Sequence, residues 1–161
     1  MKPILDACCG SRMFWFDKQN PNVVYADIRH EDLDLNHGNR TCHIGPDKIH
    51  DFRKMDFPND TFYLVVFDPP HLIGAGKNGY MAKKYGSLDR LTWREDIRRG
   101  FTECLRVLKP NGTLIFKWNE ESVRVSELID VIGVEPLFGH RTLQSSKTIW
   151  MAFMKTKEDF F

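Results

Sequence analysis

The sequence has no long apolar run. No stretch approaches the ~18 consecutive apolar residues of a membrane-spanning helix, and the first residues do not form a secretory signal. Only four cysteines are present, and together with the histidines they match neither a disulfide framework nor a common zinc spacing. We therefore expect a cytoplasmic protein with free thiols, no membrane association and no bound metal.

Net charge is also nearly absent, because 23 Lys and Arg offset 22 Asp and Glu. The overall charge therefore neither attracts nor repels a polyanion strongly, and any contact with nucleic acid must come from a local basic patch. The chain has 161 residues, of which 42% are hydrophobic. Two separate cores would leave each half too small to bury enough surface, so we expect a single domain over residues 1–161.

Short apolar runs alternate with helical patterns, which is typical of βα units packed on a parallel sheet. An apolar stripe at four-residue spacing, Trp93, Ile97, Phe101 and Leu105, predicts a helix over 92–108. A second helix is expected over 121–132. The pattern predicts strands over 4–9, 23–28, 63–67, 113–118, 136–138 and 148–154, with a short edge element at 49–55. The last two strands are expected to be antiparallel.

Two segments interrupt this alternation. Residues 28–50 are polar and contain turn formers such as Gly45 and Pro46, which predicts an excursion or small hairpin. Residues 73–91 are rich in glycine and lysine, which predicts a loop or lid on the substrate side. This loop carries Lys83, Lys84 and Tyr85, a mixture that suits a nucleic-acid backbone beside an unstacked base. A solvated loop has the same composition.

Residues with chemical potential follow the first two strands. Asp6, Ala7 and Cys8 lead into Gly10, where a tight turn allows a ligand to approach the backbone closely. Asp27 ends the next strand, where a carboxylate can accept hydrogen bonds from ribose hydroxyls. Because the carboxyl ends of parallel strands meet at one edge of a sheet, the sequence predicts a nucleoside site there.

A third motif, Asp68-Pro69-Pro70-His71, directly follows the strand YLVVF. With the first two motifs and the later segment LKPNGTLIFKW, this order resembles the class I S-adenosylmethionine-dependent methyltransferases over nearly the whole chain. The resemblance implies an α/β fold with a Rossmann-like seven-stranded sheet. That sheet would be mostly parallel, with an antiparallel C-terminal strand and helices on both faces, and S-adenosyl-L-methionine would be the cofactor.

The resemblance also assigns residues around the cofactor. Asp6 and Gly10 match the family's first motif, whereas Cys8 and Arg12 stand where glycines are expected. Asp27 matches the acidic residue after the second strand. The other cofactor-binding candidates are Ala7, Ile28, Asp51 and Phe52. For Asp51, a role as an ordinary turn residue is an equal alternative.

The Asp-Pro-Pro-His segment resembles the loop of methyltransferases that act on planar amino groups. The Asp68 carboxylate and the Pro69 carbonyl would accept hydrogen bonds from the amino group and favour a pyramidal nitrogen. The two prolines, Pro69 and Pro70, would hold these acceptors in place. His71 would stack on the target base or act as an acid-base group. Lys117 is expected on the substrate side of the same edge.

These features predict a methyltransferase that acts on an amino nitrogen of a nucleic-acid base, with adenine as the first choice. Sequence-specific enzymes of this kind usually carry a separate recognition region, for which 161 residues leave no room. Target recognition would then come from a homodimer, a partner protein or the 73–91 loop. Two alternatives stay open, namely methylation of a small molecule or protein amide, and a non-catalytic regulator that binds S-adenosylmethionine.

Overall fold

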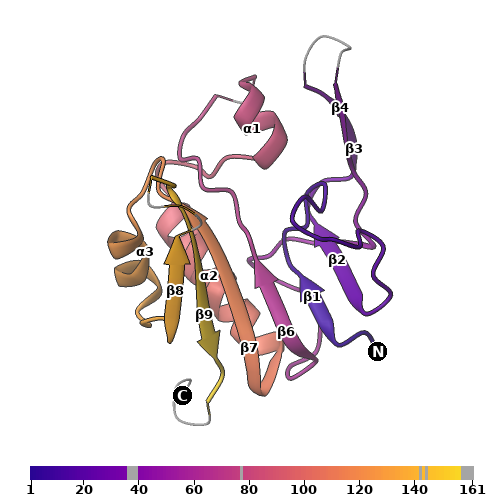
Figure 1. The fold of residues 1–161 in the computed structure, drawn as a ribbon, viewed down its shortest axis with the longest axis vertical. Coiled ribbons are helices and arrows are strands. Elements are labelled where there is room, and N and C mark those ends of the chain that lie inside the picture. Colours follow the sequence, from indigo (N-terminus) through magenta and orange to yellow (C-terminus); the bar gives the residue numbers. More distant parts are fainter. Residues whose placement is uncertain (36–39, 77, 142, 144, 157–161) are drawn as a thin grey trace.

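The computed structural model describes residues 1–35, 40–76, 78–141, 143 and 145–156 (Figure 1). Its centre is a seven-stranded sheet in the order β5-β2-β1-β6-β7-β9-β8. The strands are β1 (Ile4–Asp6), β2 (Val23–Asp27), β5 (Lys48–Ile49), β6 (Phe62–Phe67), β7 (Leu108–Asn119), β8 (Phe138–Arg141) and β9 (Thr148–Met154). β5, β2, β1, β6 and β7 pair in parallel, whereas β9 is antiparallel to both of its neighbours. This arrangement confirms the expected fold class.

The main hydrophobic core lies between the sheet and two helices, α2 (Trp93–Val107) and α3 (Val125–Ile132). The predicted stripe on α2 is confirmed, because all four of its residues are buried. α2 contacts β6, β7 and α3, and Figure 1 shows it behind the sheet. Leu128 and Ile132 of α3 belong to the same core, so both helices cover one face.

The expected helices on both faces are therefore found on only one. The second face is covered at β1 and β2 by residues 11–22, which form turns and no helix. Trp15 from this segment packs beside Cys9, Val23 and Tyr25. The backbone turns immediately after Gly10, where Arg12 adopts a left-handed conformation with φ 57° that a continuous helix could not contain.

The two interrupting segments have structure of their own. Within 28–50, β3 (Glu31–Asp34) and β4 (Thr41–Ile44) form the expected hairpin, and residues 36–39 lie outside the described part. Within 73–91, the expected loop contains a short helix, α1 (Tyr80–Tyr85), with residue 77 outside the described part. α1 is bounded by Gly79 and Gly86. Figure 1 shows that α1 and the hairpin project from the same end of the sheet.

Several element boundaries differ from the predictions. β1 ends at Asp6 rather than residue 9, and β7 begins at Leu108 rather than residue 113. The edge element at 49–55 is the two-residue strand β5 followed by a turn. α3 begins at Val125 rather than residue 121, because Asn119 Oδ1 accepts the Glu121 N–H at 2.9 Å and ends β7 in a turn. Glu120 then accepts the Val125 N–H at 2.8 Å. The strand predicted at 136–138 is β8, displaced to Phe138–Arg141, and residues 142 and 144 of the following connection are not described.

Candidate active site

The candidate site lies where the chain reverses its direction of progress through the sheet. β1 has β2 on one side and β6 on the other, so a crevice forms between their carboxyl ends. In open α/β sheets this switch point is where ligands bind. Asp6, Asp27 and Asp68 all follow or end these three strands, so the fold brings the three predicted carboxylates to one edge.

A glycine turn fixes the second of these carboxylates. Gly10 has φ +49°, and its N–H donates to Asp27 Oδ2 at 2.9 Å. An added Cβ at Gly10 would meet no atom within 4 Å, so the positive φ itself explains the glycine. Asp27 Oδ1 accepts from the Arg29 N–H at 2.9 Å and from Arg29 Nε at 3.3 Å. The Asp27 side chain is therefore held rigidly beside the turn.

Asp6 supports the same turn from below. It is fully buried, and it accepts hydrogen bonds from Trp15 Nε1 at 2.7 Å and from the Cys8 N–H at 3.3 Å. Burial raises the pKa of Asp6 to about 7, although the bond from Trp15 opposes this shift. The structure thus places Asp6 as an organiser of the turn rather than as a group facing a ligand.

Two small cavities open at this edge. The first, here the Asp27 cavity, has a volume of about 210 Å³ and includes Ala7, Cys8, Asp27, Ile28, Phe52 and Pro70 in its lining. The second, the Asp68 cavity, has a volume of about 50 Å³ and includes Gly10, Phe14, Asp68, Pro69, His71 and Lys117. The two cavities are adjacent, because Cys8, Arg29, Asp68 and Tyr85 line both.

Asp68 forms an ion pair in the smaller cavity. Lys117 Nζ lies 2.8 Å from Asp68 Oδ2, and both side chains are about one fifth exposed. Burial raises the pKa of Asp68, and the Lys117 charge opposes that shift. Oδ1 accepts no hydrogen bond from the described residues and is not sealed from solvent. This oxygen is the acceptor that remains available to a ligand.

His71 lies against the end of α1. Its ring centroid is 5.8 Å from that of Tyr85, with the two planes at 47°. Burial lowers the pKa of His71, and the Lys117 charge acts in the same direction. A neutral imidazole beside Tyr85 offers an aromatic face to a ligand, and the stacking and acid-base roles of His71 both stay predictions.

Further contacts attach the end of α1 to the site. Arg29 Nη1 donates to the Lys83 carbonyl at 3.1 Å, and Tyr85 Oη lies 3.8 Å from Met13 Sδ. Gly86 packs so closely on Pro70 that an added Cβ would lie 3.2 Å from its ring. Lys84 and Tyr85 accordingly line the Asp68 cavity.

Lys83 does not join the other substrate candidates. It lines a third cavity with Gly74 and Ala75, which shares Arg29, Gly86 and Ser87 with the Asp27 cavity but includes neither Lys84 nor Tyr85. Adjacent residues of this short helix point in different directions, so only Lys84 reaches the site. The structure therefore brings together Lys84, Tyr85 and Lys117 and leaves Lys83 apart.

The Asp51-Phe52 pair divides between two roles. Phe52 lines the Asp27 cavity and packs under α2, where a Cβ on Gly100 would lie 2.5 Å from its ring. The Asp51 carboxylate instead binds the Arg53 guanidinium, with Oδ2 at 2.6 Å from Nη2. Hydrogen bonds from Arg53 lower the pKa of Asp51. This geometry agrees with the turn alternative for Asp51.

The sequence-based predictions missed several lining residues, including Arg29, His50 and Phe14. His50 is buried, and its Nδ1 is the one buried side-chain nitrogen or oxygen without a partner in the described part of the chain. Arg29 follows Asp27 by two residues and His50 precedes Asp51. Position next to a motif was therefore the available signal for both.

The described residues contain no helix long and apolar enough to cross a membrane. They also contain no group of three or more His, Cys, Asp or Glu side chains arranged to hold a metal ion.

The fold matches solved structures of methyltransferases. An S-adenosylmethionine-dependent methyltransferase from Methanosarcina mazei aligns with a TM-score of 0.55, 13% identity, and coverage of 95% of this chain and 92% of that one. The N-methyltransferase NodS from Bradyrhizobium japonicum aligns with a TM-score of 0.53 and 13% identity, and the match covers 96% of this chain and 85% of that one. A putative methyltransferase from Haloferax volcanii, solved with its Trm112 activator, aligns with a TM-score of 0.51 and 12% identity. That match covers 95% of this chain and 82% of the other. No family model and no curated protein sequence matches the chain, so the likeness establishes the fold.

Proposed function

We propose that this protein transfers a methyl group from S-adenosyl-L-methionine to an amino nitrogen of a nucleic-acid base, with adenine as the favoured target. The observation that carries the proposal is the junction of the Asp27 and Asp68 cavities at the switch point of a methyltransferase fold. A cofactor side and an acceptor side are then in contact. The methyltransferase structures with the same fold support this reading.

The lining of the Asp27 cavity fits an adenosyl group. The Asp27 carboxylate is held in place by Gly10 and still has lone pairs for ribose hydroxyls. Ile28 and Phe52 offer apolar surface for a purine. Bound S-adenosylmethionine would supply an electrophilic methyl group on its sulfonium. Since ligand sites usually measure about 300–1,000 Å³, we expect the α1 end that covers the 210 Å³ cavity to move outward on binding.

On the acceptor side, Asp68 Oδ1 and the Pro69 carbonyl would accept the two N–H groups of the target amine. These contacts draw the nitrogen lone pair away from the ring and toward the methyl donor. As the bond from nitrogen to the methyl carbon forms, the carbon–sulfur bond of the donor would break and leave a neutral thioether. The surplus proton on nitrogen would pass to the Asp68 carboxylate, whose pKa is raised by burial. Lys117 keeps that carboxylate ionised before the reaction. Holding the amine in place, rather than strong general base catalysis, would supply most of the rate.

The test is transfer of tritium from labelled cofactor to DNA, RNA and protein, followed by mass spectrometry of the product. Asp68→Ala should abolish transfer and leave cofactor affinity, measured by calorimetry, within a few fold. Asp27→Ala should instead weaken cofactor binding by at least about tenfold, the loss of a charged hydrogen bond. Asp56→Ala, at a 93% exposed carboxylate, is the matched control and should change neither quantity.

The proposal fails if Asp68→Ala retains full turnover, since the acceptor loop would then have no part in the reaction. Label in protein alone would favour the amide alternative. Cofactor binding without transfer to any substrate would favour a regulator. The Haloferax volcanii structure contains an activator protein, so the assay should include a cell extract as a source of a partner that aids target recognition.

A further inference from the structure

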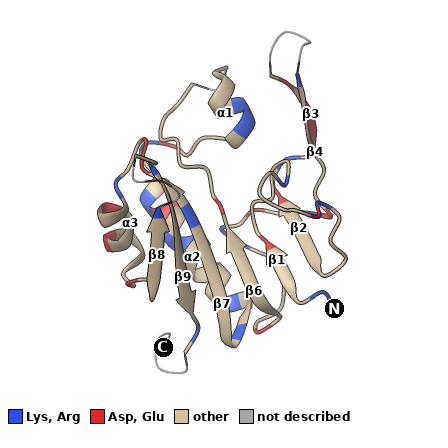
Figure 2. Ribbon diagram, viewed as in Figure 1, with Lys and Arg blue, Asp and Glu red and all other residues tan. Residues whose placement is uncertain are grey.

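A large groove lies beside the candidate active site. It has a volume of about 760 Å³, and its walls come from the β3–β4 hairpin, from the segment after Gly10 and from the end of α1. Leu35, Thr41 and Cys42 line the hairpin side, whereas Gln19 and Asn20 line the opposite wall. Figure 2 shows basic positions on α1 and on the hairpin. This groove plays no part in the reaction described above.

The charged side chains of the groove are mostly basic. Among its described lining residues, five are Lys or Arg and one is a carboxylate: Lys2, Arg12, Lys18, Arg40, Lys84 and Asp47. The net charge of the whole chain is only +1, so this concentration of positive charge is local. It is the kind of basic patch that the sequence required for any contact with a polyanion.

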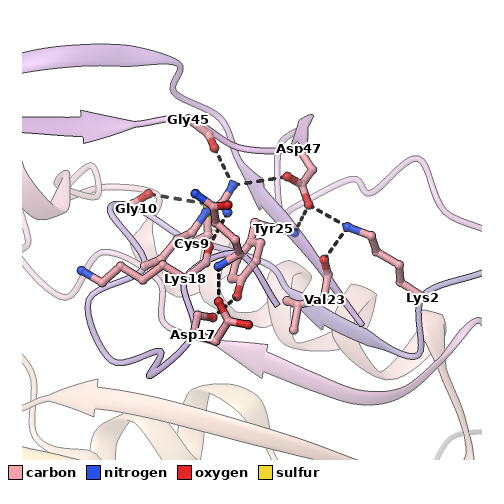
Figure 3. A network of polar contacts seen from close by, with 11 residues as sticks. Lys2, Cys9, Gly10, Asp17, Lys18, Val23, Tyr25, Gly45 and Asp47 are labelled. Carbon is pink, nitrogen blue, oxygen red and sulfur yellow. Dashed lines mark hydrogen bonds and ion pairs between the residues drawn. The ribbon is translucent and has the colours of Figure 1, made fainter. Parts of the chain in front are cut away.

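Two of the five cations build the groove. The Arg12 guanidinium donates to the Lys18 carbonyl at 2.6 Å and to the Gly45 carbonyl at 2.7 Å, and lies 3.8 Å over the Tyr25 ring. Lys2 and Arg12 both pair with Asp47. Figure 3 shows Lys18, Gly45 and Asp47 gathered in this network. The groove is therefore held open by its own side chains, and its only carboxylate is neutralised.

The other three cations have no carboxylate partner among the described residues. Lys18 is exposed, Arg40 makes one long contact of 3.5 Å to the Tyr80 hydroxyl, and Lys84 lies 5.0 Å from the Tyr85 ring. The basic face of α2 differs in this respect. There Arg94, Arg98 and Arg106 are each paired with a glutamate, which cancels much of the field that would attract an anion. Arg99 on the same helix contacts only the Arg53 carbonyl, at 3.5 Å, among the described residues.

The groove also leads into the site. Gly10, Ser11, Met13 and Lys84 line both the groove and the Asp68 cavity. A chain lying along the groove would therefore pass directly beside Asp68. Its unpaired cations come from the 11–22 segment, the hairpin and α1, so they border it on three sides rather than forming one cluster.

We infer that this groove binds the phosphodiester backbone of a nucleic acid and presents one of its bases to Asp68. Lys18, Arg40 and Lys84 would contact phosphates, and no base reading is assigned to them. The presentation of a base rests on the proposed methyl transfer, but backbone binding does not. A groove of this volume has room for an extended strand.

Binding is tested without cofactor, by fluorescence anisotropy with labelled single-stranded DNA and RNA of 12 nucleotides at several salt concentrations. Lys18→Gln and Lys84→Gln should each weaken binding about fivefold at 0.1 M salt, since one single-strand phosphate contact contributes about 0.7 to the logarithmic salt slope. The logarithmic salt slope should fall by about 0.7 in each variant. Lys83→Gln, one residue from Lys84 but outside the groove, and Lys54→Gln, on another exposed surface, are matched controls and should leave both quantities unchanged.

Unchanged affinity and salt slope in both groove variants would overturn the inference, as would an equal loss in the control variants. Displacement of the strand by polyglutamate at equal charge concentration would also overturn it in favour of an acidic protein partner. Whichever probe binds more tightly, DNA or RNA, indicates which nucleic acid the groove accepts. If the groove variants lose binding while Asp68→Ala retains turnover, only the proposed methyl transfer fails. If Asp68→Ala is inactive while the groove variants bind normally, only the groove fails.

Discussion

Arg12 offers a stability test of the departure from the family motif. Its backbone has φ 57°, a left-handed conformation that costs an L-residue about 1–2 kcal/mol and costs glycine almost nothing. The family resemblance predicts glycine at this position. The sequence therefore tolerates strain here, and the side chain must compensate for it.

The compensation can be worked out from the contacts. Arg12 is only 16% exposed, so solvent screens its interactions little. Its two hydrogen bonds to the Lys18 and Gly45 carbonyls are each worth about 1.5–3 kcal/mol, because the donor is charged. Arg12→Gly loses both and gains only the strain relief. We expect its free energy of unfolding to fall by about 2–4 kcal/mol, and its melting temperature by about 5–15 °C.

Arg12→Ala separates the two effects. Alanine loses the same contacts and keeps the strained backbone, so this variant should be about 1 kcal/mol less stable than Arg12→Gly. Urea unfolding at pH 7, followed by circular dichroism, should give the highest free energy of unfolding for the native protein, a lower one for Arg12→Gly and the lowest for Arg12→Ala. An Arg12→Gly protein as stable as the native one would refute the compensation, and an alanine variant as stable as the glycine one would refute the strain.

Three other changes test the site. Lys117→Met removes the charge that lowers the pKa of Asp68, so the acid limb of the pH profile of kcat/KM should move to higher pH. Lys117→Arg should leave the acid limb where it is. An unmoved limb in Lys117→Met would contradict the pairing of Lys117 with Asp68. Asp6 holds its proton in the folded protein up to about pH 7 but only to about pH 3.8 when unfolded, so its contribution to stability falls as pH rises between these values. Asp6→Asn should remove that decline in urea unfolding at pH 4.5 and 7.5, and an unchanged dependence would contradict burial as its cause. Gly86→Ala places a methyl 3.2 Å from Pro70 at φ +79°, and both residues line the Asp27 cavity, so turnover should fall several fold and cofactor affinity should weaken with it. Native turnover would show that the acceptor loop tolerates displacement.

The sequence predicted the sheet well because each strand carries its own signal. The apolar runs at β1, β2, β6 and β9 end at Asp, Gly or polar turns, and the stripe on α2 has a clear helical period. Helix placement was less predictable. α1 has no buried residue and therefore no apolar stripe to detect. The second face of the sheet is covered by turns around Trp15, a tertiary contact that periodicity does not report.

For the site, sequence position located the backbone but not the partners of each side chain. Asp27 and Asp68 could be placed because strand ends converge at a sheet edge. Asp51 could not, because Arg53 lies two residues away and reaches its carboxylate only in this turn. Likewise, Lys83 and Lys84 are equivalent in the sequence, and only the direction of each side chain separates them.

One short helix joins the two parts of the proposed mechanism. Lys84 lines the basic groove, and the next residue, Tyr85, lines both cavities at the sheet edge. The Arg29 guanidinium donates both to the Lys83 carbonyl at this helix end and to Asp27, the carboxylate proposed to bind the cofactor. A phosphate held at Lys84 would therefore order the same residues that cover Asp68. Substrate recognition and closure of the methyl-transfer site can then be performed by one element, without a separate recognition domain.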